Sequence, residues 1–312
     1  MRYFPVFLDL SNKAVLVVGG GEVACRKIEA LMRAGANVTI VSPKIAPQLK
    51  AWVDQERCHW IQNFYSSQLI SRDYVQVWAT TDNPRLNHQV FHDAKSAGVL
   101  VNVVDDQPYC DFITPSMIER GRIQLAISSG GASPVLIRNL RETLESVLPQ
   151  NLALLADFAA SKRNSIKEHL TSVDLRRKFW EVFFAQTAVK NATSRESLET
   201  QYCLALQQPI DERGEVTWIE CGSDIELLSL KGLRYMQQAE LVLFYHACDD
   251  EFVNLCRRDA ERESFSHPAQ LSERLTVAKN AQQRVVVLIP SARQEYLLLQ
   301  GQEKVLKQGS EG

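Results

Sequence analysis

The feature that most constrains the fold is a glycine-rich turn between a short apolar segment and an amphipathic one. Residues 14–18 (AVLVV) are continuously apolar, as expected of a strand that is buried on both faces of a parallel sheet. Residues 19–24 read GGGEVA, and apolar residues then recur at helical spacing as far as Gly35, a typical C-capping glycine. This order of strand, turn and helix predicts the first unit of a doubly wound α/β fold.

Strand and helix patterns continue to alternate beyond this unit. The expected elements are strands at 38–41, 75–79 and 99–103 and helices at 44–54 and 84–97. Such alternation is typical of a Rossmann-type parallel sheet with helices on both faces. We therefore predict a dinucleotide-binding domain over residues 1–112.

The glycine turn has the Gly-x-Gly-x-x-Ala pattern of a pyrophosphate site. Gly19 permits a tight turn, Gly21 lets the backbone approach a pyrophosphate, and Ala24 lets helix and strand pack closely. The helix N-terminus then offers N–H groups and its positive dipole end to the phosphates. The alternative is a purely structural glycine turn.

Ligands of such sheets sit at the carboxyl ends of the strands, which selects the candidate cofactor-binding residues. They are Gly19, Gly20, Gly21, Glu22, Val23, Ser42, Pro43, Lys44, Thr80, Thr81, Asp82, Asn102 and Val103. The acidic residue that usually grips the ribose is missing from residues 41–44 (VSPK). Ser42 could bind a ribose hydroxyl and Lys44 a 2′-phosphate, so the motif alone does not choose between NAD and NADP. A helix N-cap before Pro84 is an equally good interpretation of Asp82.

The pattern changes after residue 112, where an α+β region and a helical region are expected. The predicted elements are strands at 112–118 and 122–128 and helices at 134–147, 150–171 and 174–185. Ser133 is the expected N-cap of the first of these helices, with Pro134 at its first position. Residues 186–210 are polar and poorly periodic, so we interpret them as a linker.

The last hundred residues predict a second, small α/β unit. Its expected elements are strands at 214–219, 241–245 and 284–289 and a helix at 225–237. The polar tail after residue 300 is expected to fray.

Composition and charge exclude several classes of protein. The formal net charge of −2 gives no basic field for nucleic acid, and no window approaches the length of a membrane span. Residues 1–7 do not have the pattern of a signal peptide. The seven cysteines contain no C-x-x-C pair, which favours reduced thiols in a cytoplasmic protein over disulfides or a zinc site. His88 and His92 have a spacing that could hold a metal, but we interpret them as helix-surface residues and predict no resident metal.

Several blocks of the first 210 residues resemble one family in sequence order. They are 17–27 (VVGGGEVACRK), 79–82 (ATTD), 102–105 (NVVD), 112–116 (FITPS), 128–135 (SSGGASPV) and 177–184 (RKFWEVFF). The family is that of sirohaem synthase and its stand-alone relative, precorrin-2 dehydrogenase/sirohydrochlorin ferrochelatase. Together these blocks are far more specific than the glycine motif.

The resemblance implies an enzyme that is both an oxidoreductase and a lyase. It would oxidise precorrin-2 to sirohydrochlorin with NAD and insert ferrous iron at the same site to give sirohaem. It also implies a homodimer in which residues 113–147 and the following helices form the dimer and its substrate clefts. The family's catalytic aspartate falls on Asp105 and its phosphorylatable serine on Ser128. Without the resemblance, Asp105 in the run 105–108 (DDQP) would be interpreted as a turn former.

The chemistry implied for Asp105 is sensible for a carboxylate. It could act as general base when hydride leaves the ring, and it could accept pyrrole protons as iron enters. The substrate carries many carboxylates, so cationic and N–H-donating groups should line its cleft. The candidates are Ser128, Gly130, Gly131, Ser133, Arg120, Arg138 and Arg141. Each of these arginines, considered alone, is equally well interpreted as an ordinary charge on the protein surface.

Residues 211–312 resemble the start of uroporphyrinogen-III C-methyltransferase. The likeness lies in 214–217 (GEVT), 227–233 (LLSLKGL) and 257–262 (RRDAER). The functional segments are replaced: 220–224 (ECGSD) stands for a glycine-rich segment, Tyr245-His246 for a Tyr-Asp pair, and 288–291 (LIPS) for a glycine-rich loop. The sequence then stops before a whole methyltransferase could form. We predict a degenerate remnant without methyl transfer.

The expected organisation therefore has four parts: an NAD-binding domain (1–112), a dimerisation region (113–148), a helical domain with linker (149–210) and the degenerate segment (211–312). Two alternatives to the bifunctional enzyme are a dehydrogenase without chelatase activity and a non-catalytic NAD-binding protein.

Overall fold

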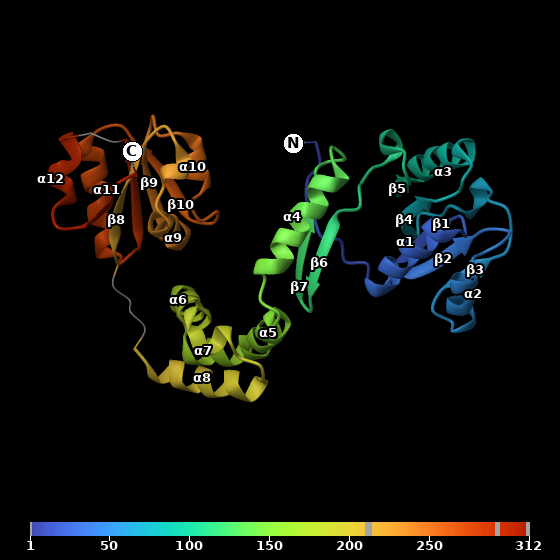
Figure 1. Ribbon diagram of the computed structural model, residues 1–312, viewed down its shortest axis with the longest axis horizontal. Coiled ribbons are helices and arrows are strands. Elements are labelled where there is room, and N and C mark those ends of the chain that lie inside the picture. The colour runs from blue at the N-terminus through green and yellow to red at the C-terminus, as the bar shows by residue number, and fades with distance from the viewer. Residues whose placement is uncertain (1, 210–213, 291–293, 310–312) are drawn as a thin grey trace. The chain divides into compact units, whose positions relative to one another are not determined.

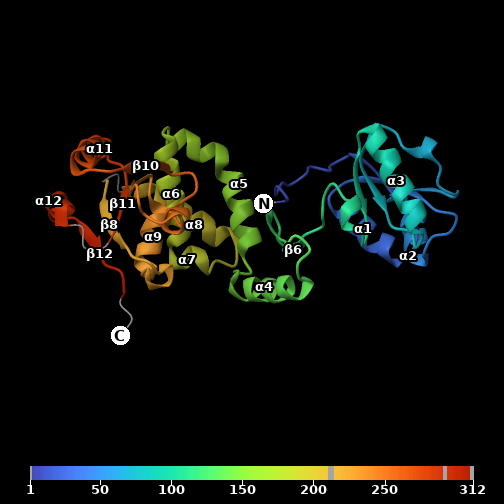
Figure 2. The same cartoon turned by 90° about the horizontal axis from the view of Figure 1, so that it is seen from above.

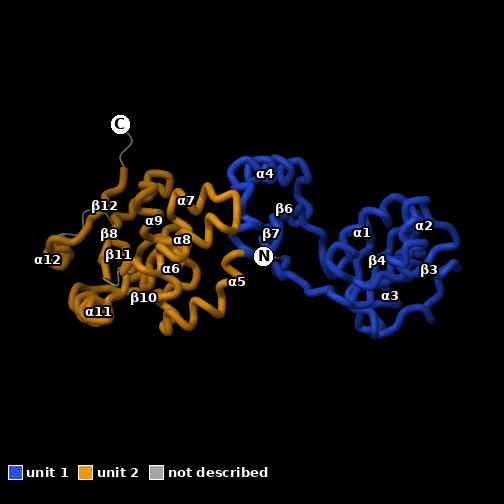
Figure 3. The backbone as a smooth tube through the Cα atoms, turned by 90° about the horizontal axis from the view of Figure 1, so that it is seen from below, with its two compact units in different colours: residues 1–157 blue, residues 158–312 orange. Residues whose placement is uncertain are grey.

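The computed structural model describes residues 2–209, 214–290 and 294–309. The chain divides into two compact units, residues 1–157 and 158–312, and each is described by itself (Figure 3). The expected boundary between residues 210 and 211 and the side chain of Ser291 lie outside the described residues.

The first unit begins with a five-stranded parallel sheet. Its elements are β1 (Ala14–Val18), α1 (Glu22–Arg33), β2 (Asn37–Val41), α2 (Pro47–Asp54), β3 (His59–Ile61), β4 (Tyr74–Ala79), α3 (Pro84–Ala97) and β5 (Leu100–Val103). The strand order is β3-β2-β1-β4-β5, which confirms the Rossmann-type sheet (Figure 1). The sequence did not predict β3, because three residues are too few to show a periodicity.

Both faces of this sheet are covered, which explains the continuous apolar run of β1. Val15 and Val17 pack into a core with α1 and α2. Leu16 and Val18 point the other way and pack into a second core with α3. Successive side chains of a strand alternate between faces, so a strand with helices on both sides must be apolar throughout.

The rest of the first unit is a hairpin and a helix (Figure 2). The strands β6 (Ser116–Arg120) and β7 (Ile123–Ile127) pair antiparallel and contact α4 (Pro134–Val147). Ser133 caps α4 as predicted, since its Oγ accepts a hydrogen bond of 3.2 Å from the Leu136 N–H. None of the α4 side chains is buried, although the helix is amphipathic. An apolar face that includes Val135, Leu136 and Leu140 is therefore left exposed in the single chain.

The helical region contradicts the expected linker. Its elements are α5 (Leu152–His169), α6 (Val173–Ala185), α7 (Thr187–Lys190) and α8 (Arg195–Gln207), and the last two lie within residues 186–210. Tyr202 of α8 is buried against the rings of Phe158, Phe179 and Phe183. This aromatic core, rather than a clear helical period, stabilises α8.

The C-terminal part forms a second parallel sheet. Its elements are β8 (Val216–Cys221), α9 (Leu230–Gln238), β9 (Leu241–Tyr245), α10 (Asp250–Asn254), β10 (Glu261–Phe265), α11 (Pro268–Asn280), β11 (Val285–Pro290), α12 (Leu297–Gln300) and β12 (Lys304–Leu306), in the order β10-β9-β11-β8-β12. The sequence missed α10, β10 and α11. The prediction of a frayed tail is wrong for residues 304–306, because β12 pairs with β8.

Within the second unit, ion pairs of two glutamates join the helical region to the C-terminal sheet. Glu240, whose side chain is only 10% exposed, forms ion pairs with Arg177 of α6 and with Arg284. Glu181 of α6 forms ion pairs with the same Arg284 at 2.7 Å and with Arg257 at 3.8 Å. Because the pairs are partly buried, each carboxylate is required to offset the desolvation of the guanidinium groups.

Candidate active site

The turn after β1 packs tightly against the turns that follow β2 and β4. Gly19 has a positive φ of 120°, and a Cβ there would lie 2.5 Å from Thr80 Oγ1. A Cβ on Gly20 would overlap the Lys44 carbonyl oxygen and lie 2.8 Å from Ile45 Cγ2. These two glycines are therefore required by the protein itself.

Gly21 differs from its neighbours because none of the described residues packs against it closely enough to require a glycine. Its φ of −87° is ordinary for any residue, and no atom lies within 4 Å of a Cβ built on it. It is the N-cap of α1, and no side chain caps the first N–H groups of that helix. A helix N-terminus with open space in front of it and no capping side chain is suited to a phosphate group.

Three hydroxyl groups around this turn donate their hydrogens within the protein. Ser42 Oγ donates to the Lys44 carbonyl oxygen at 2.6 Å, Thr80 Oγ1 to the Val18 carbonyl oxygen at 2.9 Å, and Thr81 Oγ1 to Asn87 Oδ1 at 2.6 Å. Their oxygens can therefore meet a ligand only as acceptors.

The other candidate cofactor residues of this edge lie near the surface. Glu22, Pro43, Lys44 and Asp82 are exposed, and Val23 is half-buried. The interpretation of Asp82 as a helix cap is wrong. Asn83 caps α3, since its Oδ1 accepts hydrogen bonds from the N–H groups of Arg85 and Leu86 at 3.1 and 3.3 Å.

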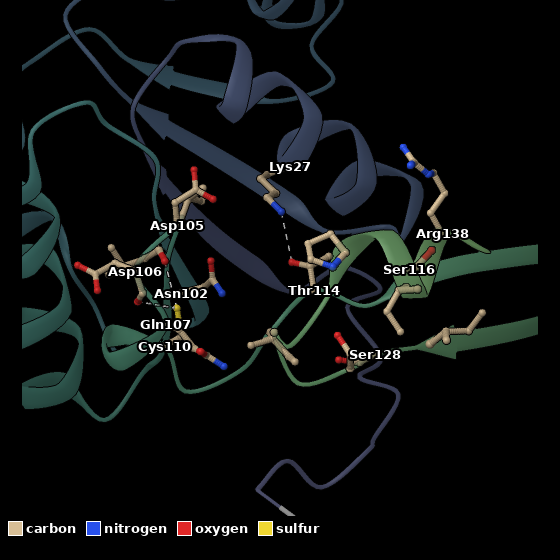
Figure 4. Close-up of a pocket in the computed structure, with 18 of the residues that line it drawn as sticks. Lys27, Asn102, Asp105, Asp106, Gln107, Cys110, Thr114, Ser116, Ser128 and Arg138 are labelled. Carbon is tan, nitrogen blue, oxygen red and sulfur yellow. Dashed lines mark hydrogen bonds between the residues drawn. The ribbon is translucent and has the colours of Figure 1, made fainter. Parts of the chain in front are cut away.

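An open cleft of about 640 Å³ lies between the end of β5, the β6–β7 hairpin and α4 (Figure 4). It brings together seven of the predicted residues: Asn102, Val103, Asp105, Ser128, Gly131, Arg138 and Arg141. Side chains that the sequence did not predict also line it, among them Lys27, Asp106, Gln107, Cys110, Thr114 and Ser116. Residues from the Rossmann sheet and from the following region thus share one cleft.

Asp105 is at the tip of the turn that follows β5. The Asp106 N–H donates to the Val103 carbonyl oxygen at 3.2 Å, and Asp105 has a φ of +61°. Aspartate and asparagine tolerate this left-handed conformation better than most residues. Asp105 is therefore a turn former, and its exposed side chain also lines the cleft.

Lys27 reaches the cleft from α1, and the sequence did not single it out. Its Nζ donates to Thr114 Oγ1 at 3.3 Å and lies 5.4 Å from the centre of the Trp78 ring. Burial lowers the pKa of Lys27, the neighbouring Arg26 lowers it further, and the negative charge of Asp105 opposes both effects. The signal for Lys27 in the sequence is its membership of the block 17–27.

Hydrogen bonds fix the loops that flank Asp105. His88 Nε2 lies 2.6 Å from Asp106 Oδ2, and the His88 ring stacks on Tyr109 with 3.8 Å between centroids. Gln107 Nε2 donates to the Gly130 carbonyl oxygen at 2.9 Å and so joins this turn to the loop before α4. His88 is thus paired with a carboxylate. In the described part of the chain, no group of three or more His, Cys, Asp or Glu side chains is arranged to hold a metal ion.

Three of the predicted substrate-binding residues do not line the cleft. Arg120 instead forms an ion pair with Glu145 of α4, and this partner accounts for its position. The Ser133 hydroxyl oxygen accepts the hydrogen bond that caps α4. Gly130 lies in the same loop but contributes its carbonyl oxygen to Gln107.

Two family models match the chain. A model described as putative NAD(P)-binding matches residues 6–116, and one described as the sirohaem synthase dimerisation region matches residues 151–200. The second match falls on the helices α5 to α8 rather than on the hairpin and α4.

Curated proteins that are similar in sequence to this chain include sirohaem synthases. That of Mannheimia succiniciproducens is 46% identical over 264 residues, which cover 84% of this chain and 55% of the relative. That of Actinobacillus succinogenes is 44% identical over 298 residues, which cover 92% of this chain and 62% of the relative. The chain thus spans a little over half the length of these curated relatives.

The fold is shared with solved structures, among them a precorrin-2 dehydrogenase. SirC, a precorrin-2 dehydrogenase, aligns over all of its own chain and 65% of this one, with a TM-score of 0.55 and 24% sequence identity. Among the residues that the structure describes, no helix is long and apolar enough to cross a membrane.

The different surroundings of Gly20 and Gly21 give a stability prediction. Gly20→Ala should lower the free energy of unfolding by about 2 kcal/mol, because the new methyl group overlaps backbone atoms of the next turn. Gly21→Ala is the matched control and should change it by less than about 0.5 kcal/mol. Urea denaturation of both variants measures the difference, and equal stabilities would contradict this account of the turn.

Proposed function

The chain is similar to sirohaem synthases over a little more than half of their length, and on that premise we propose that it oxidises precorrin-2 to sirohydrochlorin with NAD and then inserts ferrous iron to give sirohaem. One observation carries the proposal: an uncapped helix N-terminus and a carboxylate-bearing cleft are built on the same edge of one sheet. Gly21 follows β1, Asp105 follows β5, and β4 pairs with both strands. Strands in a sheet lie about 4.8 Å apart, so these two strand ends are separated by about 10 Å.

The residues around the glycine turn fit a dinucleotide. The backbone of residues 19–21 and the first N–H groups of α1 would hold its pyrophosphate, since Gly21 leaves that approach open. Asn102 and Val103 line the cleft on the side of Asp105. When bound, NAD supplies the acceptor for the hydride that leaves the substrate. Of the two dinucleotides left open by the motif, we propose NAD.

Asp105 is the group proposed to receive the proton that must leave the substrate together with the hydride. Its carboxylate lines the cleft and is exposed, so it can accept a proton and release it to water. The same property suits metal insertion. Two pyrrole N–H protons must leave as a divalent iron enters the macrocycle, and the carboxylate can accept them one at a time. Iron is a substrate in this scheme and requires no resident site.

The substrate carboxylates are proposed to meet the wall of the cleft that α4 forms. Arg138 and Arg141 line this wall, and the loop of residues 128–133 precedes it. Arg141 Nη2 also lies 3.7 Å from Glu145 Oε1, so the positive charge of Arg141 is already partly compensated. Guanidinium groups bind carboxylates through paired hydrogen bonds, which gives such contacts directional specificity.

A homodimer in the cytoplasm is the proposed state of the protein. The match to a dimerisation region and the exposed apolar side chains of α4 support the dimer. The free cysteines support a reducing compartment.

Residues 211–312 are proposed to have no methyltransferase activity, and to act as a structural element fixed to α6 through Glu240. We predict that the purified protein transfers no methyl group from S-adenosylmethionine to uroporphyrinogen III. Radiolabelled S-adenosylmethionine provides the assay. Label in the tetrapyrrole fraction above that of a reaction without protein would refute the prediction.

Asp105→Asn tests the catalytic role without disturbing the turn. Asparagine also tolerates a positive φ, so thermal stability and the Kd for NAD should stay within about twofold of wild type. Removal of the base should lower kcat for precorrin-2 oxidation by about 10²-fold or more. The absorption spectrum of the tetrapyrrole follows the reaction, and a variant with wild-type kcat would remove Asp105 from this role.

A second arm of the same experiment separates the two activities. Sirohydrochlorin and ferrous iron are mixed without NAD, and sirohaem formation is compared with the rate without protein. Wild type should accelerate insertion, and Asp105→Asn should do so less. If wild type oxidises precorrin-2 but does not accelerate insertion, the protein is a dehydrogenase only.

A further inference from the structure

Two cations that line the cleft, Lys27 and Arg138, have no carboxylate partner among the described residues. In the part of the chain that the structure describes, no carboxylate oxygen is paired with Lys27 or Arg138, whereas Arg141 lies 3.7 Å from Glu145. Lys27 comes from α1 of the Rossmann sheet, and Arg138 comes from α4. The two unpaired charges thus come from different walls of one cavity.

The surroundings of Lys27 leave its charge incompletely compensated. The residue is half-buried, and Thr114 Oγ1 at 3.3 Å accepts one of the three hydrogens of its ammonium group. The Trp78 ring, 5.4 Å away, gives a modest attraction. Burial lowers the pKa of this lysine despite the opposing charge of Asp105. A partly desolvated cation with unused donors is stabilised when an anion binds to it.

We propose that Lys27 binds a carboxylate of the tetrapyrrole substrate in the cleft that Arg138 and Asp105 also line. The inference rests on the proposed function, which supplies the chemical class of the substrate. Figure 4 shows the Lys27 side chain directed from α1 toward Thr114, in the same cavity as Asp105 and Ser128.

Lys27 is better placed for the substrate than for the cofactor's phosphates. The proposed phosphate site is at the first residues of α1, next to Gly21, whereas Lys27 lies more than one helical turn further along that helix. The cleft wall formed by β5 carries the carboxylates of Asp105 and Asp106, which repel a substrate carboxylate. Anionic groups of the substrate are therefore favoured near Lys27 or Arg138 rather than at the turn after β5.

A contact of this kind forms in the bound substrate and persists in the transition state. Removal of the contact should therefore raise KM and leave kcat nearly unchanged. We expect Lys27→Met to raise KM for precorrin-2 about tenfold and to leave kcat and the Kd for NAD within about twofold. Lys27→Arg keeps the charge and should recover most of the loss. Arg26→Met is the matched control, because this neighbouring cation is exposed and does not line the cleft.

Equilibrium binding of sirohydrochlorin, followed by its absorption spectrum, provides a readout independent of turnover. Weaker binding by Lys27→Met, with wild-type binding by Arg26→Met, supports the inference. Wild-type KM and sirohydrochlorin affinity in Lys27→Met, or a fall in kcat alone, would overturn it while leaving the proposed function intact. If wild type itself neither binds sirohydrochlorin nor oxidises precorrin-2, the proposed function fails, and the inference fails with it. Lys27→Gln replaces Lys27→Met if the latter does not fold.

Discussion

The close packing of three turns at one edge of the Rossmann sheet is the constraint on which the rest of the structure depends. The turn after β1 can approach the turns after β2 and β4 only because Gly19 and Gly20 lack side chains. Since these turns pack directly against one another, α1 begins at the edge of the sheet. Gly21 then leaves the front of that helix open. The same edge carries the turn after β5, so the candidate phosphate site and Asp105 follow from one arrangement of strands.

Charge is distributed unevenly around the cleft that lies next to this edge. The turn after β5 contributes Asp105 and Asp106, while α1 and α4 contribute cations. Asp105 adopts a left-handed conformation that most residues avoid, and such local exceptions are expected where a side chain serves a function. The hydrogen bond between Gln107 and Gly130 joins the acidic turn to the loop before α4. An anionic substrate bound on the cationic side would therefore lie beside a carboxylate that can accept protons.

Local patterns predicted the parts of the fold and of the site that depend on short stretches of sequence. The apolar run of β1 and the glycine turn predicted the Rossmann sheet, and the rule that ligands bind at strand ends predicted Asn102. Asp105 was selected through the family resemblance. Features that depend on distant partners were missed. The helix α8 is stabilised by Tyr202 against aromatic rings of α5 and α6. Lys27 is positioned by Thr114, which is 87 residues away, and Arg120 is held outside the cleft by Glu145, 25 residues away. The division of the chain into four parts stays a prediction.

We infer that the space in front of Gly21 is kept open for a dinucleotide and not for the needs of the fold. Calorimetric titration of NAD into wild type and Gly21→Ala tests this most directly. A methyl group there meets no atom of the other described residues within 4 Å, so it should obstruct only the ligand. In Gly21→Ala, NAD affinity should fall at least about tenfold while the protein stays folded. Equal affinities for NAD in the two proteins would contradict it.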